Sequence, residues 1–226
     1  IKVVLVQDRG VLGGNASSEI RMWICGAHGK DNRETGIIEE IMLENFFQNP
    51  QLSYSLWDMV LFDKTARQDN LTLLLNTSCL DANTENGKII SITAWQSPCE
   101  TVHTIKARYF ADCSGDSILS TLTGAHFRYG REAESEFGES IEPKTADKKT
   151  MGMSCLFQVR ETDKPQKFTP PEWAYKYCTD DDIPFREHDL SSNFWWIETG
   201  GEGDCIHDTD KCRDELLKIA YGVWDH

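Results

Sequence analysis

The sequence predicts an α/β fold that combines a parallel sheet with a three-stranded β-meander. Two strand-like runs, residues 2–7 and 108–116, each lead into a glycine-containing turn, as strands of a parallel sheet do. Between them, two segments with helical periodicity precede segments in which apolar and polar residues alternate. We therefore expect parallel strands buried on both faces and amphipathic helices in the connections.

The first part of the chain contains one predicted strand and two predicted helices. The strand at residues 2–7 is mostly apolar, and a glycine-rich turn follows at residues 10–14, where glycine permits positive φ angles. Residues 33–48 and 54–67 place apolar side chains at helical spacing, with most acidic residues on the other face. Pro50 separates these two helices.

The next part of the chain changes from helical to strand periodicity. A buried strand is expected at residues 71–76, and alternation predicts the three antiparallel strands of the meander at residues 78–82, 88–95 and 101–107. A further buried strand at residues 108–116 enters a glycine turn. The pattern at residues 117–123 then predicts a helix.

From Ala125 onward the composition becomes more charged, which predicts a second domain. We expect residues 1–124 and 125–226 to form separate domains, the second beginning with a long charged connection. Its predicted elements are strands at 150–160 and 193–198, a short helix opened by prolines at 169–173, and a final helix at 210–224 capped by Asp208 or Thr209.

Composition excludes several kinds of partner. The chain has 23 Lys and Arg against 37 Asp and Glu, a net charge of −14, and its basic residues form no cluster. A nucleic-acid partner is therefore not expected. Nor is a membrane span, because the longest apolar-rich run, residues 37–47, is interrupted by glutamates and an asparagine. The eight cysteines form no C-x-x-C pair and are expected to be mostly free thiols.

One cluster near the C-terminus contains residue types that bind metals. Its members lie within ten residues and are Cys205, His207, Asp208, Asp210 and Cys212. Their spacing matches no standard zinc pattern, and the aspartates are explained as charges at a helix N-terminus. We therefore predict no metal site.

Polar residues at the end of the first strand suggest a dinucleotide site. Gln7 and Asp8 stand where such a unit holds the ribose hydroxyls, although an ordinary strand-to-helix turn explains them equally well. Further along, His28, Arg21 and Cys25 are weak candidates for an acid or base beside a substrate. A histidine satisfied within a loop is the simpler interpretation of His28.

Several long blocks of sequence are similar to one known family. Residues 7–19, 33–40, 111–116, 130–140 and 150–154 resemble the FAD-dependent oxidoreductases that share the glutathione-reductase-type FAD fold. The resemblance extends over the whole chain. It implies an incomplete FAD/NAD(P)-binding domain with a three-stranded β-meander, followed by part of an α+β substrate domain.

The resemblance also implies cofactor contacts at particular residues. Gln7 matches the ribose ligand, usually Glu in the family, and Gly13 with Gly14 matches the double-glycine loop beside the flavin. Ser17 offers a further hydrogen bond there. The complete set of implied FAD contacts is Gln7, Asp8, Arg9, Gly13, Gly14, Asn15, Ser18, Cys79, Gly115 and Asp116.

In this family the first strand and its phosphate-binding glycines precede the position of Ile1, and a segment completing the flavin pocket follows that of His226. The resemblance therefore implies a fragment that is inactive alone and free of FAD, with a sheet edge through which copies can self-associate. Any targeting signal would lie upstream of Ile1, which leaves a cytoplasmic or a periplasmic location open.

For the intact protein, the resemblance implies hydride transfer from a small substrate to FAD. The aromatic and acidic composition suggests a carbohydrate-related substrate. Two alternatives remain. One is a non-catalytic nucleotide-binding or assembly module with structural glycine turns, and the other is a nicotinamide enzyme that uses the same turns.

Overall fold

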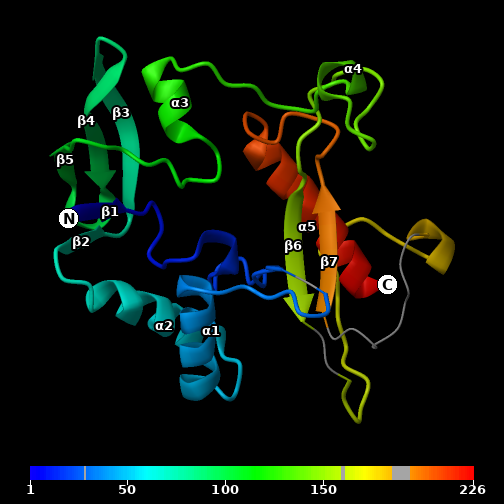
Figure 1. Ribbon diagram of the computed structural model, residues 1–226. Helices are drawn as coiled ribbons and strands as arrows, with labels where there is room; N and C mark the ends of the chain where they lie inside the picture. The colour runs from blue at the N-terminus through cyan, green and yellow to red at the C-terminus, as the bar shows by residue number, and fades with distance from the viewer. Residues whose placement is uncertain (28, 159–160, 185–193) are drawn as a thin grey trace. The chain divides into compact units, whose positions relative to one another are not determined.

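The structure is a computed structural model that describes residues 1–27, 29–158, 161–184 and 194–226. It divides into two compact units, Ile1–Phe127 and Arg128–His226, each of which combines helices with small sheets (Figure 1). None of the described helices is long and apolar enough to cross a membrane.

The first unit begins with a pair of parallel strands. β1 (Val3–Val6) pairs with β2 (Leu71–Leu74), and the helices α1 (Ile37–Gln48) and α2 (Tyr54–Ala66) lie between them in the sequence. This confirms the strands predicted at residues 2–7 and 71–76, the parallel setting expected for the first, and both helices.

The expectation that the first strand is buried on both faces is wrong. Val3 and Val4 are 46% and 44% exposed. Within the described residues, β1 belongs to a sheet of two strands, and so small a sheet leaves much of each strand in contact with solvent.

The predicted meander is confirmed. β3 (Thr77–Glu85), β4 (Lys88–Gln96) and β5 (Thr101–Lys106) form an antiparallel sheet in the order β3-β4-β5. Its buried side chains come mainly from β4, where alternation directs Ile92 and Ala94 to the same face.

The strand predicted at residues 108–116 does not form. This stretch is irregular, with Tyr109 84% exposed, until α3 (Ile118–Thr123) begins. Among the described residues no strand pairs with it, and an extended segment without a neighbour leaves its backbone groups unpaired.

The second unit is built around an antiparallel strand pair packed against a helix. β6 (Met153–Gln158) pairs antiparallel with β7 (Phe194–Thr199), and α5 (Thr209–Asp225) lies against this pair, as Figure 1 shows. These elements confirm the last two predicted strands and the final helix. The core consists of Ile197, Leu216 and Ala220, with Met153, Cys155, Phe157, Ile219 and Val223 packed around them.

Two short elements lie elsewhere in this unit, α4 (Glu134–Phe137) and a 3₁₀ turn at Asp180–Asp182. The helix predicted at residues 169–173 is wrong. The chain makes a single turn, in which Ala174 N–H donates to the Pro171 carbonyl at 3.0 Å. Tyr175 N–H then donates to the Lys218 carbonyl of α5 at 3.2 Å, so α5 takes the donor that a continuing helix would use.

Candidate functional site

The glycine-rich loop begins at Gln7, which the surrounding strands hold in place. Gln7 N–H donates to the Leu74 carbonyl at 2.9 Å, and the Gln7 carbonyl accepts from Thr77 N–H at 2.8 Å. The side-chain Nε2 donates to the Val11 carbonyl at 2.9 Å. The Gln7 amide therefore stabilises the loop from within.

The two glycines of this loop differ in their surroundings. Gly13 has φ 105° and Gly14 has φ 55°, both in the region that favours glycine. A Cβ atom added at Gly13 would lie 2.8 Å from Leu61 Cδ1, whereas one added at Gly14 would meet no atom within 4 Å. The loop therefore packs on α2 at Gly13 and leaves open space at Gly14.

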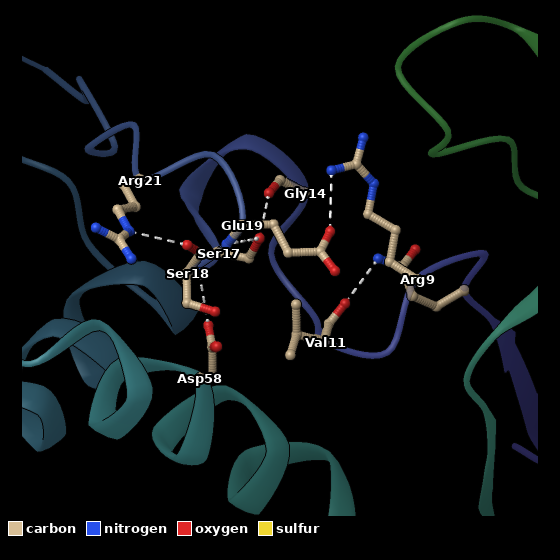
Figure 2. A network of polar contacts seen from close by, with 9 residues as sticks. Arg9, Val11, Gly14, Ser17, Ser18, Glu19, Arg21 and Asp58 are labelled. Atoms are coloured by element: carbon tan, nitrogen blue, oxygen red, sulfur yellow. Dashed lines mark hydrogen bonds and ion pairs between the residues drawn. The ribbon is translucent and has the colours of Figure 1, made fainter. Parts of the chain in front are cut away.

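Two serines fix the loop behind Gly14 (Figure 2). Ser17 is fully buried, and its hydroxyl donates to the Gly14 carbonyl at 2.7 Å within the short 3₁₀ helix Gly14–Ala16. Ser18 N–H donates to Asp58 Oδ1 on α2 at 2.9 Å. Sequence reasoning missed Asp58, because nothing in the local pattern of α2 points to a partner so far away in the chain.

Two arginines lie beside the loop. Arg9 Nη1 forms a 3.1 Å ion pair with Glu19 Oε2, and Arg21 Nε donates to the Ser18 carbonyl at 3.1 Å. The Arg21 guanidinium also lies 5.4 Å from the centre of the Tyr54 ring. The loop thus carries two cationic side chains, both partly accessible to solvent.

The remaining residues predicted near this loop are less constrained. Asp8 and Asn15 are exposed, although the Asn15 carbonyl accepts from Met22 N–H at 2.8 Å. Of the three acid or base candidates, Arg21 supports the loop, Cys25 is exposed, and His28 lies outside the described residues.

The second glycine turn is organised by Asp112, which sequence reasoning did not select. Its carboxylate accepts hydrogen bonds from Ser114 N–H at 3.0 Å, Ser114 Oγ at 2.7 Å and Leu119 N–H at 2.8 Å. These bonds, led by the Ser114 hydroxyl, hold the pKa of Asp112 below its ordinary value. Asp116 is exposed, and Gly115, with φ 84°, has no atom within 4 Å of an added Cβ.

Cys79 lies on β3 close to this second turn. Burial raises the pKa of its thiol, and the nearby Asp112 carboxylate contributes in the same direction. No hydrogen bond or ion pair among the described residues joins the second turn to the glycine-rich loop. The predicted cofactor contacts therefore fall into two groups. One group consists of those within residues 7–18, and the other consists of Cys79 and the turn at Gly115.

The second unit contains a cavity of about 930 Å³, lined by residues 130–131, 149–151 and 198–202. Arg131 on its wall forms a bidentate pair with Asp147, in which Nε lies 3.1 Å from Oδ1. Hydrogen bonds from Arg131 hold the pKa of Asp147 at about 2. Lys149 is paired with Glu202. Charged side chains of both signs thus line this cavity.

Thr150 lines the cavity, but its hydroxyl is enclosed by the protein. Its Oγ1 is buried and has no hydrogen-bond partner within the part of the chain that the structure describes. Buried polar atoms usually have partners. The cavity wall includes residues from two of the blocks that carry the family resemblance, 130–140 and 150–154. The resemblance of these two blocks was the sequence signal that could have located the cavity.

Together, the helices, the parallel strand pair and the open glycine-rich loop at its end make the first unit an α/β structure of the kind in which such loops often approach a nucleotide. A protein-family model for FAD dependent oxidoreductases matches residues 1–209. The chain belongs to this family, which confirms the resemblance found in the sequence. Neither a curated protein nor a solved structure matches the chain.

FAD is the cofactor that the family implies, and the residues of the first unit fit it. A flavin dinucleotide needs close approach to backbone and compensation of its diphosphate charge. The open space at Gly14 and Gly115 allows the first. Arg21 supplies positive charge, and Arg9 would do so on release from its ion pair with Glu19. In the described residues, no group of three or more His, Cys, Asp and Glu could hold a metal ion.

Proposed function

We propose that the first unit is a glutathione-reductase-type FAD-binding domain that positions FAD for hydride transfer from a small substrate. The open backbone at Gly14, anchored from behind by Ser17 and Ser18, is the observation that carries this proposal. When bound, the flavin supplies the chemistry, which is acceptance of a hydride and transfer of electrons to an acceptor.

The residues of the chain would contribute binding and orientation. Gln7 and Asp8 would hydrogen-bond the ribose hydroxyls, and Arg9 would offset the negative charge of the diphosphate. Gly115 and Asp116 would approach the phosphate and ribose side of the cofactor. The side-chain nitrogen of Gln7 already donates to the Val11 carbonyl. Its side-chain oxygen, Oε1, is therefore the atom that would accept a hydrogen bond from a ribose hydroxyl.

We further propose that the cavity of the second unit binds the substrate. A cavity of about 930 Å³ is large enough for a small molecule. Its paired charges favour a substrate rich in hydroxyl groups, such as a sugar derivative. A Glu198→Ala variant, which removes an exposed carboxylate from the cavity wall, should bind a monosaccharide panel more weakly, while Glu172→Ala, at an exposed position of the same unit, should not.

The test of FAD binding compares two glycine substitutions. Gly14 and Gly87 both have positive φ, 55° and 73°, and both lack atoms within 4 Å of an added Cβ. Alanine therefore costs about 1 kcal/mol of backbone strain at either position. Only Gly14→Ala places a methyl group in the proposed binding space, so it should weaken FAD affinity by at least about tenfold.

The measurement is the flavin absorbance at about 450 nm that remains with the full-length protein after added FAD is removed by gel filtration. Uptake by wild type and Gly87→Ala, but not by Gly14→Ala, supports the proposal. A full-length protein that takes up no FAD favours the non-catalytic module instead. A rise in Tm with NAD and none with FAD favours the nicotinamide enzyme.

A further inference from the structure

Two cysteines meet where β7 ends and α5 begins. Cys205 lies in the turn between these elements, and Cys212 lies in the first turns of α5. A Cβ atom added at Gly200 would lie 2.9 Å from Cys205 Sγ and 3.2 Å from Cys212 Sγ. The two sulfur atoms therefore face the same backbone position.

Local hydrogen bonds hold both cysteines in this arrangement. The Cys205 thiol donates to the Gly200 carbonyl at 2.8 Å, and the Cys205 carbonyl accepts from the Thr209 hydroxyl at 2.7 Å. Cys212 N–H donates to the Asp208 carbonyl at 2.9 Å as part of the helix. These bonds hold the turn that contains Cys205 against the start of α5, which contains Cys212.

The two thiols also influence each other chemically. Burial raises the pKa of Cys212, and both the charge of Cys205 and a hydrogen bond with it raise the pKa further. At neutral pH Cys212 is therefore held mainly as the protonated thiol. Its reactivity should therefore increase with pH.

The neighbouring residues argue against a metal at this position. His207 is 83% exposed, and its Nδ1 lies 2.6 Å from Asp204 Oδ2 rather than beside the sulfurs. The part of the chain that the structure describes contains no cluster of three or more ligands. Two adjacent thiols without further ligands are suited to thiol–disulfide chemistry.

We propose that Cys205 and Cys212 are a redox pair that closes to an intramolecular disulfide by exchange with a small disulfide such as oxidised glutathione. Cys205 thiolate attacks one glutathione sulfur, which forms a mixed disulfide and releases the first glutathione thiol. Cys212 then loses its proton, attacks Cys205 Sγ and releases the second glutathione. Two protein thiols are oxidised to one S–S bond, and one glutathione disulfide is reduced to two thiols that retain both protons.

The bond would join the turn to α5 beside residues 200–202, which line the cavity of the second unit. Its formation requires neither FAD nor substrate, so this inference stands independently of the proposed function. We expect the disulfide to reduce the amide hydrogen exchange of residues 200–212, because it constrains the opening of this turn.

The experiment equilibrates the purified chain in buffers with increasing ratios of oxidised to reduced glutathione, blocks free thiols with N-ethylmaleimide and maps the peptides by mass spectrometry. We expect a peptide pair linking Cys205 to Cys212, lighter by about 2 Da than the two reduced peptides. The matched control is Cys178→Ser, which removes an exposed cysteine of the same unit and should leave the link intact.

Cys212→Ser should instead accumulate the glutathione adduct on Cys205, because no second thiol resolves it. The peptide map of the wild-type chain tests the proposal even if the Cys212→Ser variant does not fold. The proposal is overturned if both cysteines are alkylated at every glutathione ratio, or if either one is linked mainly to a different cysteine.

Discussion

The backbone N–H of Ser18 donates a 2.9 Å hydrogen bond to the carboxylate of Asp58, 40 residues further along the chain. One turn beyond Asp58 on α2, Leu61 fills the space against Gly13, so that a Cβ added there would be 2.8 Å from its Cδ1. The same face of α2 therefore supports the glycine-rich loop at two points, one polar and one apolar.

Asp58→Ala should destabilise the first unit by about 1–2 kcal/mol, because it leaves the Ser18 N–H without its charged acceptor. Asp63→Ala is the matched control on the same helix. Asp63 pairs with Arg67 at the surface, so its loss should cost less than about 0.5 kcal/mol. Urea denaturation measures both free energies of unfolding. Equal losses would show that the Ser18–Asp58 bond contributes nothing specific.

The Arg131–Asp147 pair predicts an acid-sensitive step in the second unit. Hydrogen bonds from Arg131 lower the pKa of Asp147 from 3.8 to about 2 in the folded chain. A lowered folded-state pKa stabilises the fold above the unfolded value, and this contribution is lost as the pH falls from 3.8 towards about 2. NMR titration of the Asp147 carboxyl should have its midpoint near 2, and Arg131→Met should move it up towards 3.8. A midpoint unchanged by Arg131→Met contradicts this account.

Elements defined by local periodicity could be predicted from the sequence. The apolar positions of α5 recur every three or four residues, and Leu216 and Ala220 are indeed buried against β7. The turn at Gly87 lies between two alternating segments, which identifies the β3–β4 hairpin. In each case the information lies within about one helical turn or one hairpin of the residue concerned.

Features that depend on distant partners could not be predicted. The stretch 108–116 has the composition of a strand, but strands form by pairing, and the described chain offers it no neighbour. Tyr175 donates its N–H to Lys218, 43 residues away, and this ends the turn that the prolines before it open. The Asp58 contact to the glycine-rich loop and the Arg131–Asp147 pair on the cavity wall likewise join residues with no common local pattern.

Leu216 and Leu217 offer a matched pair for measuring the core of the second unit. They are adjacent on α5, but Leu216 is 5% exposed and Leu217 is 38% exposed. Leu216→Ala should cost about 3 kcal/mol, because it leaves a cavity against Ile197, whereas Leu217→Ala should cost less than about 1 kcal/mol. Urea denaturation followed by circular dichroism gives both values. A larger effect at Leu217 would mean that α5 presents a different face to β6 and β7.

Gly222 tests whether helix propensity or packing dominates in α5. Alanine is favoured over glycine in a helix by about 1 kcal/mol. However, a Cβ at Gly222 would lie 2.5 Å from the Tyr175 carbonyl oxygen and 2.9 Å from Tyr177 Cε2. The Tyr175 backbone is held by its bond to the Lys218 carbonyl, so it cannot easily move away. Overpacking costs about 1–3 kcal/mol, and we expect it to exceed the gain in helix propensity.

Gly222→Ala should therefore lower the free energy of unfolding and the Tm. Asp214→Ala is the control, since it also improves helix propensity but changes a side chain that is 62% exposed. This variant should change stability by no more than about 0.5 kcal/mol. If Gly222→Ala instead raises the Tm, the segment at Tyr175 is not packed against α5, because helix propensity would then act without opposition.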